Sequence, residues 1–224
     1  MLAGTFALAQ QPLKAHVELT HNGHRAKDAS KAVVWLTPVG TTVEAPRQDP
    51  SQIPQLVQKN KSFQPSLIVI PTGGKVEFPN HDPFFHNVFS LFEGKRFDLG
   101  LYESGTTRFV QFDKPGVSFI FCNIHAEMSA VVIALATPYY AISDARGDIS
   151  LPDVPPGRYQ MQVFHTSVSA DTLRTLSREI TVSPGETTLG TITLAESDVT
   201  VAHKNKYGHD YDPPQPDSPA YARP

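Results

Sequence analysis

The chain contains a single cysteine, and the residues that follow it carry the other donor atoms of a metal site. Cys122, His125 and Met128 place a thiolate, an imidazole and a thioether three residues apart, directly after an apolar run. His86 supplies a second imidazole from another apolar run upstream. A lone cysteine is most often a buried structural residue, but two imidazoles, one thiolate and a weak axial thioether are the ligands of a blue-copper electron-transfer site. The spacing therefore predicts that these four residues bind copper.

Residues 63–135 resemble the cupredoxins, and among them the proteins similar to plastocyanin and amicyanin. The resemblance rests on the four ligands and on the glycine-containing runs at 73–78 and 116–122. The two-residue gap between His125 and Met128 is similar to that of amicyanin. The resemblance implies a Greek-key β-sandwich that holds one type 1 copper ion per chain, with His125 as the port through which electrons pass.

Two asparagines lie where they could hold the ligands in place. The resemblance implies that the backbone N–H of Asn87 donates to the cysteine sulfur, a bond of the kind that tunes a metal site. Asn80 ends the apolar run before His86, and we expect its side chain to pin the ligand loops. A plain turn asparagine would give the same sequence pattern.

Apolar residues beside the ligands predict a docking surface. Phe84 and Phe85 precede His86 in a proline-containing loop, and Ala126 lies within the loop that carries the other ligands. These side chains could shield the copper or form a small apolar patch that faces a redox partner. Charged residues nearby, such as Asp82 and Glu127, are expected to form an ordinary solvated surface.

The composition indicates an ordinary globular chain with one large or two small domains. It has 224 residues, of which 40% are hydrophobic and 18% charged, within the usual range for folded proteins. The net charge of -3 gives no reason to expect nucleic acid or an anionic membrane as a partner. No apolar run reaches the roughly 20 residues of a membrane-spanning helix. Twenty prolines and 14 glycines favour short strands and turns.

The strand pattern predicts an all-β fold, and the resemblance implies a cupredoxin domain at residues 46–137 that is inserted in, or attached to, a second and smaller β-sandwich. Residues 143–159 resemble the carboxypeptidase-regulatory-like, transthyretin-like sandwich, whose usual first strands are matched before the cupredoxin, at 15–19 and 31–36. We therefore expect residues 13–45 and 138–196 to form one sandwich. The alternative is a cupredoxin with an N-terminal extension and a separate C-terminal half-sandwich, which would bury little core.

The remaining segments are expected to lie outside both sandwiches. Residues 40–60 carry three prolines and predict a linker or long loop. Residues 1–12 include a small-residue pattern typical of a signal-peptide cleavage site, so we interpret them as a signal remnant; an uncut, frayed terminus is the alternative. Residues 197–224 are polar and rich in proline, which predicts an extended or disordered tail.

Together these features predict an exported one-electron carrier, periplasmic or extracellular, that exchanges electrons with a cytochrome or a copper oxidoreductase. Four protein ligands leave no open coordination position, which metal catalysis requires, so we expect no enzymatic activity. The alternative function is copper storage or delivery. Delivery sites are usually open and rich in methionine or histidine, whereas this chain has three methionines.

Overall fold

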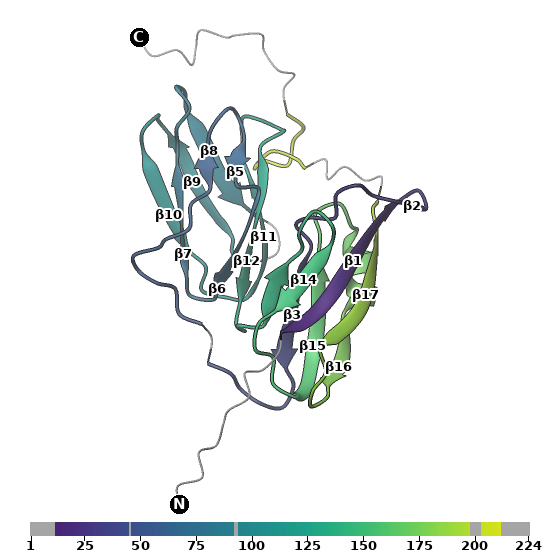
Figure 1. Ribbon diagram of the computed structural model, residues 1–224. Helices are drawn as coiled ribbons and strands as arrows, with labels where there is room; N and C mark the ends of the chain where they lie inside the picture. Colours follow the sequence, from purple (N-terminus) through teal and green to yellow (C-terminus); the bar gives the residue numbers. More distant parts are fainter. Residues whose placement is uncertain (1–11, 45, 92–93, 198–202, 212–224) are drawn as a thin grey trace, which may run out of the picture. The chain divides into compact units, whose positions relative to one another are not determined.

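The fold is almost entirely β-structure, as the sequence predicts (Figure 1). It is known from a computed structural model that describes residues 12–44, 46–91, 94–197 and 203–211. The signal remnant predicted at residues 1–12 lies outside this range except for its last residue. The chain divides into two units, one made of residues 1–44 and 139–200 and the other of residues 45–138 and 201–224.

The first unit draws its strands from both sides of the second unit's sequence. One sheet contains, in spatial order, β13 (Tyr140–Ile142), β3 (Val33–Pro38), β15 (Gly157–Phe164) and β16 (Arg178–Val182). The other contains β14 (Asp148–Leu151), β1 (Leu13–His21) and β17 (Thr188–Ala195), with β2 (His24–Arg25) paired to β1. Strand β3 therefore lies between two strands that follow it by more than a hundred residues.

Packing and buried hydrogen bonds hold the two chain segments of this unit together. Strand β1 alternates buried and more exposed residues, and its buried side chains join one hydrophobic core with Leu36 and Met161. The hydroxyl of Ser143 accepts from the backbone N–H of Ala32 and donates to the carbonyl of Ala29. A sandwich built from residues near both ends of the chain thus has a single core.

The second unit has its own hydrophobic core and carries all four predicted ligands. Its main sheet contains, in spatial order, β6 (Leu67–Pro71), β12 (Ser129–Leu135), β11 (Gly116–Phe121), β8 (His86–Ser90) and β9 (Phe97–Tyr102). Two smaller pairs complete it, β7 (Lys75–Pro79) with β10 (Thr107–Gln111) and β4 (Val57–Gln58) with β5 (Phe63–Gln64).

The register of this sheet brings the ligands to one end of the unit. Strands β11 and β12 are antiparallel, with Phe121 opposite Ser129, so residues 122–128 form the loop between them. Strand β8 is antiparallel to β11, with Phe121 opposite Phe89. Chain leaving β11 therefore runs past the beginning of β8, where His86 lies.

Two segments differ from what the sequence predicts. The sequence predicts a linker or long loop at residues 40–60. Within them, Leu56 is fully buried, and its backbone N–H donates to the backbone carbonyl of Glu77 in β7. The prolines interrupt a regular ladder, but the segment packs as part of the unit. A helix also forms, α1 (Ala170–Leu176), which begins after the capping residue Ser169. Across the described residues, no helix has the length and apolar character needed to cross a bilayer.

Candidate metal centre

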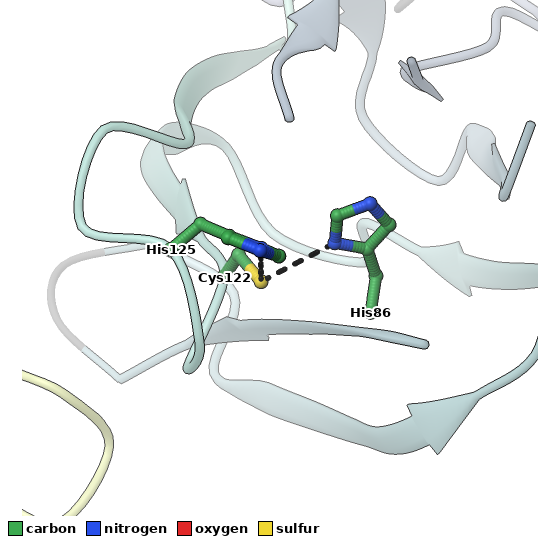
Figure 2. A group of neighbouring side chains, drawn as sticks. All are labelled: His86, Cys122 and His125. Atoms are coloured by element: carbon green, nitrogen blue, oxygen red, sulfur yellow. Dashed lines mark hydrogen bonds between the residues drawn. The ribbon is translucent and has the colours of Figure 1, made fainter. Parts of the chain in front are cut away.

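Three of the four predicted ligands converge on one point (Figure 2). The Sγ atom of Cys122 lies 3.7 Å from Nδ1 of His86 and 3.6 Å from Nδ1 of His125. The three donor atoms lie within 4.8 Å of one another. His86 begins β8, whereas Cys122 and His125 lie in the loop after β11, so two neighbouring strands supply the site.

These separations fit a single metal ion. Metal–nitrogen and metal–sulfur bonds of about 2.0–2.3 Å, meeting at trigonal to tetrahedral angles, put their donor atoms roughly 3.5–3.8 Å apart. Both sulfur–nitrogen distances fall in that range, and both imidazoles turn the same nitrogen, Nδ1, toward the sulfur. The donor set of one thiolate and two imidazoles suits a first-row metal ion, copper included.

Met128 lies at the end of the same loop and is fully buried. It belongs to the hydrophobic cluster that contains Cys122. Its backbone N–H donates to the carbonyl of His125, and its own carbonyl accepts from the N–H of Cys122. These two bonds fold the loop on itself, so the spacing of the three residues is fixed by the backbone. The role of Met128 as axial ligand stays a prediction.

A buried carboxylate orients the first histidine. His86 Nε2 donates to Asp82 Oδ2 at 2.8 Å, which leaves Nδ1 free to face the sulfur. Asp82 also accepts the backbone N–H groups of Asn60 and Lys61 at 2.6 and 2.9 Å. Although burial raises its pKa, these donors hold the pKa of Asp82 below its ordinary value. A carboxylate on the far nitrogen of a metal-binding histidine fixes its tautomer and increases its basicity.

The expectation of a solvated Asp82 is wrong, because this residue is only 4% exposed. The segment containing Asn60 and Lys61 covers the carboxylate, because both of its backbone N–H groups donate to it. The spacing of four residues between Asp82 and His86 is the one sequence signal that could have indicated the pair.

Burial sets the protonation of the ligands for metal binding. Burial lowers the pKa of His86, and burial together with His86 lowers the pKa of His125 to about 4. Both imidazoles are therefore neutral near pH 7, as metal binding requires. Burial raises the pKa of the Cys122 thiol, so the thiol keeps its proton near pH 7 and would have to release it to bind a metal.

Asn87 and Asn80 both make hydrogen bonds around the predicted ligands. The backbone N–H of Asn87 donates to the sulfur of Cys122 and lowers the pKa of the thiol, as do the N–H groups of Ile124 and His125. Asn80 is fully buried, and its side chain donates to the carbonyl of Phe84 at 2.8 Å and accepts from the N–H of Asp82 at 3.0 Å. Asn80 thereby holds both halves of the turn that leads to His86.

The three predicted docking residues differ in their exposure and in their contacts with the histidines. The ring of Phe84 is half-buried, with its centroid 5.1 Å from that of His86 and 5.7 Å from that of His125. Phe85 is 44% exposed, and Ala126 is exposed beside His125, which is itself half-buried. Phe84 therefore packs beside both histidine rings, while Phe85 and Ala126 expose apolar surface.

Residues 203–211 also contact the ligand loop, which the sequence does not predict. Tyr211 donates its hydroxyl to the carbonyl of Cys122 at 2.8 Å, and His203 donates from Nε2 to the carbonyl of Ala126 at 2.8 Å. This part of the tail predicted at residues 197–224 therefore makes defined hydrogen bonds with the loop. The polar composition of the tail gave no sign of these partners.

Comparison with known proteins gives matches among solved structures alone. No protein-family model and no curated protein matches the chain. Similar structures include a purple cupredoxin from Nitrosopumilus maritimus, 22% identical, with 37% of this chain and 99% of that one covered at a TM-score of 0.34. Amicyanin from Paracoccus versutus is 20% identical, with 39% and 85% covered at a TM-score of 0.35. A copper-containing nitrite reductase from Thermus scotoductus is 25% identical, with 45% and 26% covered at a TM-score of 0.37.

These TM-scores are low, so the similarity to these structures carries no argument about metal binding. The candidate metal site is identified from the positions of His86, Cys122 and His125. The matched share is less than half of this chain in each of the three comparisons. The resemblance of the first unit to carboxypeptidase-regulatory-like sandwiches finds no support in them.

Replacing Asp82 with asparagine should weaken metal binding by roughly 10- to 100-fold, because the neutral amide no longer increases the basicity of His86. Competition titration of Cu(II) against a chelator measures this change. Asp113→Asn, at an exposed carboxylate elsewhere in the same unit, is the matched control and should leave the affinity unchanged. Equal affinities of Asp82→Asn and the unchanged protein would contradict a role for this carboxylate.

Proposed function

We propose that this chain is an exported type 1 copper protein that carries single electrons between redox partners. One observation carries the proposal: the only thiol of the chain lies in a buried site between the Nδ1 atoms of two neutral imidazoles, at distances that one metal ion can bridge. Such a donor set, completed by a weak axial thioether, supports reversible exchange between Cu(I) and Cu(II).

The protein around the site suits electron transfer because it resists rearrangement. The loop that carries three of the ligands is closed by its own backbone hydrogen bonds, and Asn80 and Asp82 fix the turn before His86. Backbone N–H groups point at the sulfur and stabilise its anionic form. Ligands held in this way need to move little when the charge of the metal changes.

The burial of the ligands argues against catalysis at the metal. His86, Cys122 and Met128 are fully buried, so water and substrates have little access from their side. His125 is the one predicted ligand with partial exposure, and four protein ligands would leave no position for a substrate. We therefore infer that electrons, rather than substrates, reach the site, and that they pass at the ring of His125.

The partner in this proposal is a cytochrome or a copper oxidoreductase that docks on Phe84, Phe85 and Ala126. A small apolar patch suits the weak, short-lived complexes that redox proteins form. An exported location is inferred from the signal-like sequence at the N-terminus. Copper storage or delivery, the alternative, would need ready access to the metal, and the burial of three of the ligands makes that access poor.

The first test is the visible spectrum after Cu(II) loading. The protein should show an intense band near roughly 600 nm from copper–thiolate charge transfer. Cys122→Ser should abolish the band and leave the far-ultraviolet circular dichroism unchanged, because the thiolate is the coloured ligand. His81→Gln, at an exposed histidine near His86, is the control and should retain the band. A colourless protein, or a band that persists in Cys122→Ser, rules out the copper–thiolate site.

The axial role of Met128 predicts a separate result. Met128→Leu keeps a buried apolar side chain of similar volume but removes a weak donor that favours Cu(II). The variant should keep its colour and have a higher reduction potential, measured by redox titration. Met161→Leu, in the core of the first unit, is the matched control. An unchanged potential in Met128→Leu would exclude the thioether as a ligand.

Docking beside His125 predicts that Ala126→Lys slows electron transfer to a partner cytochrome while leaving the spectrum and potential nearly unchanged, because a charge opposes burial of the apolar patch. Ala136→Lys makes the same substitution at an exposed alanine beyond the other end of β12 and should have no effect. Stopped-flow mixing measures both rates. If the reduced protein instead passes Cu(I) to an apoprotein within seconds, copper delivery replaces electron transfer as the function.

A further inference from the structure

The segment of residues 203–211, here called the strap, binds the outer side of the ligand loop at three points. The Tyr211 hydroxyl donates to the carbonyl of Cys122 at 2.8 Å. The His203 ring donates from Nε2 to the carbonyl of Ala126 at 2.8 Å. The backbone N–H of Lys206 donates to the side-chain oxygen of Asn123 at 2.9 Å. Because three of the four predicted ligands lie in this loop, the strap contacts the part of the chain that sets their positions.

The two aromatic residues of the strap also support each other. The His203 ring stacks on Phe121, the residue before Cys122, with ring centroids 3.9 Å apart and an angle of 27° between the planes. The His203 ring also packs against Tyr211 in a T-shaped arrangement, with ring centroids 5.2 Å apart. Nδ1 of His203 lies 3.1 Å from the Tyr211 hydroxyl. His203 is therefore held between the end of β11 and the residue that binds the Cys122 carbonyl.

The strap has a folded turn of its own. The side-chain oxygen of Asn205 accepts the backbone N–H groups of Tyr207 and His209 at 3.0 and 3.1 Å. The N–H of Asn205 donates to the carbonyl of His209, and Gly208, at a φ of +80°, supplies the left-handed residue that the turn requires. The turn presents Lys206 to the loop in a defined position.

A second route connects the strap to the sulfur. Lys206 Nζ lies 2.8 Å from Asp98 Oδ2, and Asp98 Oδ1 accepts from the side-chain amide of Asn87 at 2.7 Å. The backbone N–H of Asn87 donates to the sulfur of Cys122. The strap thus acts on the Cys122 carbonyl directly and on its sulfur through Asp98 and Asn87.

We propose that the strap is a positioning element of the metal centre, and that Tyr211 and His203 are its principal positioning residues. They hold the ligand loop in its metal-binding conformation through the carbonyls of Cys122 and Ala126, whether or not a metal is bound. This inference extends the proposed function, because a loop fixed from outside changes little when the metal changes its charge.

Hydrogen exchange of the metal-free protein tests the strap independently of copper. In Tyr211→Phe, which removes one hydroxyl and keeps the ring, backbone amides of residues 122–128 should exchange roughly two- to tenfold faster, the effect of losing one hydrogen bond. Tyr207→Phe makes the same change in the same strap at a residue that is 69% exposed, and should exchange like the unchanged protein. Unchanged exchange in Tyr211→Phe overturns the proposal.

His203 gives a second and separable measurement. His203→Phe keeps a ring that can stack on Phe121 but removes the donor to Ala126, and should release copper to a chelator several-fold faster. His203→Gln restores a donor and should slow the release again. If His203→Phe releases copper at the rate of the unchanged protein, or if His203→Gln gives no rescue, the hydrogen bond to Ala126 has no positioning role.

The two proposals fail in distinguishable ways. If the protein without substitutions shows no copper–thiolate band, the proposed function is contradicted. The hydrogen-exchange measurement on the metal-free chain still decides the role of the strap in that case. A blue protein whose Tyr211→Phe variant exchanges normally contradicts the strap and leaves the proposed function standing.

Discussion

The candidate site depends on keeping one cysteine sulfur buried from solvent, with hydrogen-bond donors fixed around it. Cys122 follows the last residue of β11, and the register of β11 with β8 brings it beside His86 and Asn87. Burial alone would favour the protonated thiol, and it does raise its pKa. Three backbone N–H groups around the sulfur work in the opposite direction. A bound cation would complete that compensation, so the thiolate form would be more favourable with a metal than without one.

The two histidines meet a similar requirement in different ways. His86 is fully buried, and a carboxylate that is itself satisfied by two backbone donors fixes its orientation. His125 lies in the loop between two strands and is partly exposed, and hydrogen bonds within the loop and from the strap hold that loop. Of the two histidines, His86 is therefore the buried predicted ligand, and His125 is the one that reaches the surface. In the proposed role of electron carrier, this division would let a partner approach His125 without reaching the buried part of the site.

In the first unit, strands from two distant segments of the chain pair in the same sheets. Strand β3 pairs with β13 and β15, and β1 pairs with β14 and β17, although more than a hundred residues intervene. Neither chain segment has enough apolar surface to form a core alone, whereas together they bury one continuous cluster. The ligand-bearing unit has a separate core. The four predicted ligands all lie in this second unit.

Sequence by itself determined the features that depend on local spacing. Cys122, His125 and Met128 follow one another within a single loop, and alternating apolar residues indicate strands, so the all-β class and the candidate ligands could be predicted from neighbouring residues. The distant His86 could also be recognised from the sequence, because it follows the run that ends at Asn80. The meeting of Asp82 with Asn60 and Lys61, and that of Tyr211 with Cys122, were decided by tertiary structure. Contacts of this kind join residues that are remote in the chain, and only the packing of the strands brings their donors and acceptors within hydrogen-bond distance.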